Sequence, residues 1–174
     1  MEPPAAHRKK RVTRVRAKRI LVVGLGQPHR RDDGIGIRAA EVFKAMNQDP
    51  RVTVMAAQEL LPELAEVISH FDLLVFLEAR TGAEPGSVEV SELKPAESGS
   101  GVFVHTLTME TLLSAAGKLF GHAPRAVLIS IAGESFDFAY HLSPKVEAAL
   151  PLVLARLREV IARDHEKSDS SWAS

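Results

Sequence analysis

Residues 20–36, ILVVGLGQPHRRDDGIG, constrain the fold of this chain more than any other stretch. An apolar run that ends in a Gly-x-Gly turn is typical of a buried strand in a parallel sheet. A basic loop follows, and it ends in two adjacent acids, Asp32 and Asp33. Because ligands of open α/β sheets bind beyond the carboxyl ends of the strands, this loop is the first place to expect chemistry.

The remaining sequence alternates between strand-like and helix-like patterns. Apolar residues at helical spacing predict helices over residues 34–46, 62–71, 108–120 and 143–163. Apolar or alternating runs predict further strands over residues 52–56, 73–77, 87–93 and 125–132, the third of which alternates as an edge strand does. This order predicts a single-domain, three-layer α/β fold, in which a mainly parallel, twisted sheet of about five strands carries helices on both faces.

Length and charge bound the organisation of the chain. Its 174 residues are enough for one domain with a sizeable core. We expect that domain over residues 19–165, after a basic, disordered extension over residues 1–18 and before a flexible polar tail over residues 166–174. Lys+Arg and Asp+Glu balance at 22 each, and the basic run at 7–19 has no interleaved aromatic residues. We therefore expect no nucleic-acid partner.

Missing features exclude several classes of protein. The chain has no cysteine, which excludes disulfides, thiolate metal ligands and a cysteine nucleophile. No apolar run approaches the ~20 residues of a membrane span. The first residues lack the apolar core of a secretory signal peptide. We therefore expect a soluble, cytoplasmic protein with no membrane partner.

Three residues that can carry chemistry lie where a parallel sheet can bring them to one edge. Asp33 ends the first strand–helix loop, Glu78 follows the third predicted strand, and His105 precedes the third predicted helix. Two carboxylates and an imidazole suit a divalent transition metal, and two neighbouring carboxylates can also share a proton in acid–base chemistry. Structural roles are the alternative: a helix cap for Asp33, a solvated acid at Glu78 and a buried imidazole at His105.

Two other motifs fit structural roles better than chemical ones. The Gly-x-Gly turn suggests a dinucleotide site, but His29 stands where the third glycine of that fingerprint belongs, so a tight turn is favoured. Ser143 precedes Pro144, a pair typical of a helix start, which favours a cap over a nucleophile.

Four stretches together resemble the nickel-iron hydrogenase maturation endopeptidases. They are ILVVGLGQPHRRDDGIGIRAAE (20–41), QELLPELAEVISHFDLLVFLEA (58–79), GHAPRAVLISIAG (121–133) and HLSPKVEAAL (141–150). The resemblance covers residues 19–163 in order and spacing. It is greatest to the branch that acts on NAD-coupled, bidirectional-type hydrogenases.

The resemblance implies an aspartic-type endopeptidase of one α/β domain. Its substrate would be the large-subunit precursor of a nickel-iron hydrogenase, which loses a C-terminal peptide after nickel insertion. The residues that contact metal and carry catalysis would be Asp33, Glu78 and His105. No permanent cofactor is implied, since the metal would be the nickel of the substrate or a substituting divalent ion. The protein would work as a monomer. Whether metal or a carboxylate activates the attacking water stays open.

Two positions depart from the family pattern. Gln27 stands where the family usually has Asn, and Glu78 stands where Asp is usual, which moves the carboxylate by one methylene. The second departure matters more because metal geometry tolerates little displacement. The alternative function is therefore a non-catalytic assembly factor that docks on the same precursor. A nucleotide-binding protein is a third reading, which the missing glycine disfavours.

Overall fold

The computed structural model describes residues 17–97 and 107–170, which form a five-stranded sheet and the helices that cover it. The strands are β1 (Ile20–Leu25), β2 (Val52–Ala57), β3 (Leu73–Arg80), β4 (Val88–Leu93) and β5 (Arg125–Ala132). The helices are the 3-10 turn η1 (Arg31–Gly34), α1 (Ile35–Met46), α2 (Leu64–Ser69), α3 (Met109–Phe120) and α4 (Pro144–Ser170). No helix in these two ranges combines the length and the apolar character that a membrane span requires.

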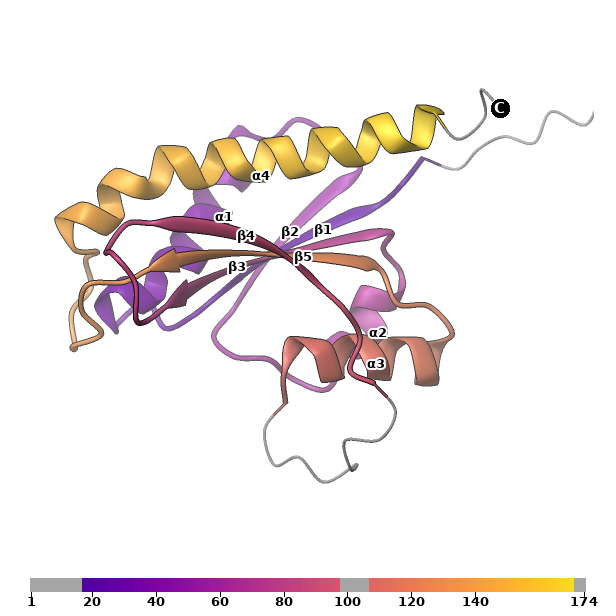
Figure 1. Cartoon of the computed structure of the whole chain (residues 1–174), viewed down its shortest axis with the longest axis horizontal. Helices are drawn as coiled ribbons and strands as arrows, with labels where there is room; N and C mark the ends of the chain where they lie inside the picture. Colours follow the sequence, from indigo (N-terminus) through magenta and orange to yellow (C-terminus); the bar gives the residue numbers. More distant parts are fainter. Residues whose placement is uncertain (1–16, 98–106, 171–174) are drawn as a thin grey trace, which may run out of the picture.

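The sheet has the strand order β2-β1-β3-β5-β4. Its first four strands are parallel, and β4 pairs antiparallel with β5 at one edge. Helices α1 and α4 cover one face, whereas α2 and α3 cover the other (Figure 1). The predicted three-layer α/β fold is confirmed, as is the edge position of the alternating strand.

Strand β3 shows why the central strands read as continuous apolar runs. Leu73, Val75 and Leu77 pack with α1 and α4, whereas Leu74 and Phe76 pack with α2 and α3. All five side chains are fully buried. Because successive residues of a strand point to opposite faces, every side chain of a stretch covered on both sides meets the core and is apolar.

Among the differences between observed and predicted element boundaries, two affect the site. β3 does not end before Glu78, because Glu78 and Arg80 pair with Ser130 and Ala132 of β5. The first α-helix does not begin at residue 34 with an acid as its cap. It follows the turn η1, and no side chain forms a capping hydrogen bond at its start.

Two glycines bring α1 very close to the sheet. A Cβ atom on Gly36 would collide with the carbonyl oxygens of Leu25 and Leu77, and one on Gly24 would collide with the Gly36 carbonyl. The first glycine of the Gly-x-Gly turn therefore serves helix–strand packing. This contact explains the motif without a nucleotide.

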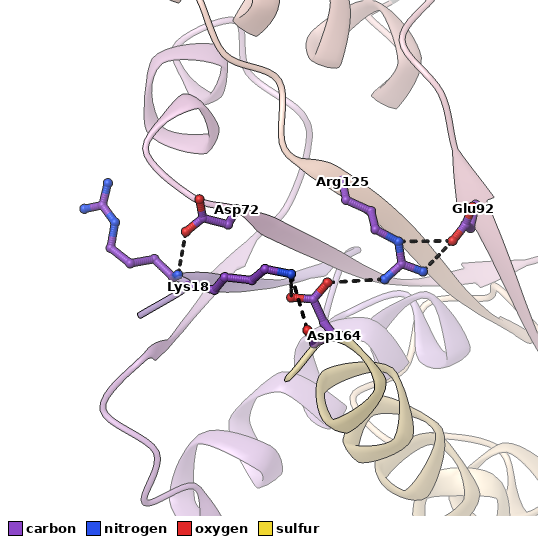
Figure 2. Close-up of polar contacts among 6 residues, drawn as sticks. Lys18, Asp72, Glu92, Arg125 and Asp164 are labelled. Atoms are coloured by element: carbon purple, nitrogen blue, oxygen red, sulfur yellow. Dashed lines mark hydrogen bonds and ion pairs between the residues drawn. The ribbon is translucent and has the colours of Figure 1, made fainter. Parts of the chain in front are cut away.

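At the amino end of the sheet, charged side chains link α4, β5 and β4 to the segment before β1 (Figure 2). Asp164 of α4 is only 3% exposed, and its carboxylate lies 3.2 Å from Lys18 Nζ and 3.6 Å from Arg125 Nη1. Arg125 also donates from Nε to Glu92 of β4 at 3.1 Å. Lys18, which we expected in the basic extension, thus contacts the domain, and residues 1–16 lie outside the described ranges.

Candidate active site

Asp32 joins the first loop to the segment that precedes α4. It is fully buried, and its carboxylate accepts four hydrogen bonds of 2.7–3.0 Å, from the N–H groups of Glu134, Ser135 and Ser143 and from the Ser143 hydroxyl. Burial by itself raises the pKa of Asp32, but the hydrogen bonds from Ser143, Ser135 and Glu134 outweigh it and hold the pKa below its usual value. Asp32 is therefore an ionised structural anchor.

Asp33 points the other way and is held by its own loop. Its Oδ2 accepts a 2.8 Å hydrogen bond from the Gln27 backbone N–H. Gly26 allows this closure, because it adopts a φ of 128° and a Cβ there would collide with the Asp33 carbonyl. The expected capping role of Asp33 is wrong, since the N-cap of α1 is Gly34 and has no side-chain bond. Because the contact uses a backbone N–H, Gln27 in place of the family's Asn leaves it intact.

Glu78 lies in β3, next to the strand β1 that leads to Asp33. Alternation along β3 places its side chain on the face that α2 and α3 cover. Burial raises the pKa of Glu78, and the carboxylates of Asp33 and Glu110 raise it further. Glu78 is thus half-buried among acids, so the reading of a solvated acid is wrong. Glu110, in the first turn of α3, was not among the residues that the sequence singled out.

Among the described residues, no cation forms an ion pair with these acids. Within residues 17–97 and 107–170, Asp33, Glu78 and Glu110 take part in no ion pair. Neighbouring carboxylates without a counter-charge bind a proton or a cation more readily than isolated ones. The raised pKa favours proton binding at Glu78, and the carboxylates can also offer oxygen ligands to a divalent ion.

His105 lies outside the described residues, so its place relative to Asp33 and Glu78 stays a prediction. Within the described ranges, no three His, Cys, Asp or Glu side chains are arranged to hold a metal ion. The start of α3, shortly after His105, is fixed by a capping box in which Thr108 and Thr111 bond to each other's backbone N–H. The two carboxylates fit the donor set that the sequence suggested, and the imidazole is not placed.

Comparisons with known proteins give this site a context. No protein-family model matches the chain. The hydrogenase expression/formation protein HupD of Rhizobium leguminosarum bv. viciae is 31% identical over 118 residues, which are 65% of this chain and 58% of HupD. The chain thus spans less than two thirds of that relative. The NiFe hydrogenase maturation protease HycI of Thermococcus kodakarensis KOD1 has a TM-score of 0.64 and 27% identity, over 84% of this chain and 91% of its own.

In sequence and in fold, the chain is similar to hydrogenase maturation proteins. The hydrogenase maturating endopeptidase HybD from E. coli has a similar fold, with a TM-score of 0.69 at 22% identity, over 84% of this chain and 93% of its own. These similarities confirm the resemblance seen in the sequence. The branch within the family stays a prediction.

Proposed function

We propose that this protein is an endopeptidase that removes a C-terminal peptide from the large-subunit precursor of a nickel-iron hydrogenase after nickel insertion. The observation that carries the proposal is the pair of uncompensated carboxylates, Asp33 and Glu78, beside neighbouring parallel strands. Ligands of open α/β sheets bind at this edge. The names of HupD and HycI support hydrogenase maturation as the process.

Glu78 is the better placed of the two acids for proton transfer. Its raised pKa brings the carboxyl closer to neutral pH, where a general base and acid work best. In the proposed reaction Glu78 takes a proton from a water molecule, and that water attacks the scissile carbonyl carbon. The proton then passes to the leaving nitrogen as the peptide bond breaks. Asp33, held by the Gln27 N–H, orients the water and keeps a negative charge at the site.

Nickel enters this scheme as part of the substrate. We propose that Asp33, Glu78 and His105 contact the nickel of the precursor, or a substituting divalent ion, so that only a loaded precursor is positioned for cleavage. Carboxylate oxygen and imidazole nitrogen are suitable donors for such an ion. The protein then requires no permanent cofactor. We also propose that it acts as a monomer in the cytoplasm on a hydrogenase of the NAD-coupled branch.

The test is a mass measurement on the purified protein with nickel-loaded and nickel-free large-subunit precursor. We expect the loaded precursor alone to lose a C-terminal peptide. Asp33→Asn and His105→Ala should abolish the loss, whereas the exposed-residue controls Glu66→Gln and His70→Ala should cleave like the wild type. Unimpaired cleavage by either site variant would contradict the site assignment. A stable complex that is never shortened would favour the assembly factor.

A further inference from the structure

A groove of about 530 Å³ lies beside the proposed active site. Its walls come from the loop after β1, from α1 and from the loop that leads into α4. The residues that matter here are Arg31, Arg38, Glu41, Tyr140 and Glu147. A volume of this size is typical of a binding cleft rather than of a packing defect.

The groove is lined by charges of both signs. Among the described residues, none of Arg31, Arg38, Glu41 and Glu147 takes part in an ion pair. A polyanion such as a nucleic acid would meet as many carboxylates as guanidinium groups there, so it would gain no net attraction. A polypeptide segment can offer partners to both signs, through its own side chains and its amide groups.

Arg31 is the most unusual residue of this lining. Its φ is 48°, and it is the sole non-glycine residue with positive φ in the described part of the chain. Its Nε is buried and has no hydrogen-bond partner. Both features cost stability, and such costs concentrate at binding sites. The strained turn is kept by a 2.9 Å bond from the Arg31 N–H to the Ala139 carbonyl.

Two exposed aromatic side chains lie next to the groove. Phe138 is 74% exposed and Tyr140 is 78% exposed, and their rings meet edge to face with centroids 5.6 Å apart. His29 lies against Phe138 at 5.8 Å. The backbone that carries these rings is fixed, because the Ala139 N–H donates to the His29 carbonyl at 3.0 Å. Rigid, exposed aromatic residues are typical anchors of protein-binding surfaces.

We propose that this groove binds the C-terminal segment of the hydrogenase precursor as an extended peptide, with a carboxylate of the segment on Arg31 and an apolar side chain against Phe138 and Tyr140. This inference rests on the proposed function and names the surface that selects its substrate. The groove lies close to Asp33, since Pro28 and Gly34 line it and Asp33 belongs to the same loop.

Binding is measured in an Asp33→Asn background, so that the precursor stays intact. Arg31→Asn removes the cation with a residue that tolerates positive φ, and the double variant Phe138→Ser, Tyr140→Ser removes the aromatic rim. We expect each to weaken binding of the full precursor by about tenfold or more, and to leave binding of the mature subunit without its tail unchanged. The matched controls are Arg156→Asn and Phe120→Ser, which are exposed residues outside the groove. Unchanged melting temperatures establish that each variant folds.

A photocrosslink identifies the occupant directly. Benzoylphenylalanine in place of Phe138 should crosslink to the C-terminal segment of the precursor, and in place of Phe120 it should not. A crosslink only to the body of the large subunit would overturn the inference. Wild-type affinity in both groove variants would also overturn the inference. If the protein with Asp33 intact still cleaves loaded precursor, the proposed function would then stand. If the wild type neither binds nor shortens the precursor, both fail.

Discussion

The acids at the two ends of the sheet lie in opposite electrostatic environments. At the amino end, Asp164 lies between Lys18 and Arg125, so its buried charge is balanced (Figure 2). At the carboxyl end, Asp33 lies close enough to Glu78 to raise its pKa, and neither acid forms an ion pair in the described ranges. Balanced charges add stability, whereas repelling charges cost stability and are kept where they serve a site. The contrast separates the part of the sheet that holds the fold from the part available for chemistry.

Asp32 shows that position alone does not decide this difference. It adjoins Asp33 in the sequence, yet N–H and O–H donors surround it and lower its pKa. Hydrogen bonds therefore stabilise the ionised form of Asp32, whereas the adjacent Asp33 raises the pKa of Glu78. Hydrogen-bond donors, more than burial, distinguish the structural acid from the acids of the proposed site.

The largest expected effect is on Asp32 itself. Asp32→Ala leaves buried N–H groups of the loop before α4 without an acceptor, and we expect it to lower the free energy of unfolding by roughly 4 kcal/mol. Asp33→Ala is the matched control and should cost about 1 kcal/mol, because it loses a single bond. Urea denaturation measures both. Equal losses would break the distinction between the two acids.

Gly26→Ala comes next. The new Cβ collides with the Asp33 carbonyl and requires a strained φ, so we expect a loss of about 3 kcal/mol together with reduced cleavage of loaded precursor. Gly82→Ala is the control, since Gly82 also has positive φ (80°) but no atom within 4 Å of the added carbon. That variant should lose about 1 kcal/mol and keep its activity. A similar loss in both would show that the collision at Asp33 is relieved easily.

At the amino end, Asp164→Ala should cost about 2 kcal/mol, because it leaves Lys18 and Arg125 without the buried acid that they share. Both cations are about one third exposed and remain hydrated, which limits the loss. Glu159→Ala, which removes an exposed partner of Arg156, should change stability by less than about 0.5 kcal/mol. Cleavage rates should be unaffected in both, and a loss of activity in Asp164→Ala would contradict the separation of the two ends.

The smallest effect has the opposite sign. The pKa of Glu78 is raised in the folded state, so the folded protein retains a proton that the unfolded chain releases, and stability falls as pH rises through that window. In metal-free buffer, Glu78→Gln should therefore be more stable than the wild type at pH 7 by roughly 0.5 kcal/mol. The gain should disappear below about pH 4.3, the usual value for Glu. Glu66→Gln should show no such pH dependence, and an identical pH profile for both variants would remove the argument for repulsion at the site.

Much of the fold follows from local sequence patterns. The run at 125–132 coincides with β5, because a strand covered on both faces is mostly apolar between Arg125 and Ala132. The end of β3 was misplaced, since Glu78 reads as a stop although its backbone still pairs with β5. An ionisable residue inside a central strand is unusual, and the proposed role of Glu78 would account for it.

The site was only partly predictable. Asp33 and Glu78 were assigned to one edge because neighbouring parallel strands end there, and the structure brings them together. The partners of Asp32 lie 102 to 111 residues away, so no local pattern indicates them. Glu110 joins the acids only because α3 packs against that face of the sheet. His105 stays a prediction.

Helix α4 is held by hydrogen bonds before its first residue and near its C-terminal end. Ser143, just before its first residue, is bonded to Asp32 at the carboxyl edge of the sheet, and Asp164 is bonded to Lys18 at the opposite edge. The helical residues between these ties span roughly 30 Å at about 1.5 Å per residue. A shift of α4 along its own axis would break both of these contacts. Glu147, which lines the groove, therefore lies in a helix that is held at both sides of the sheet.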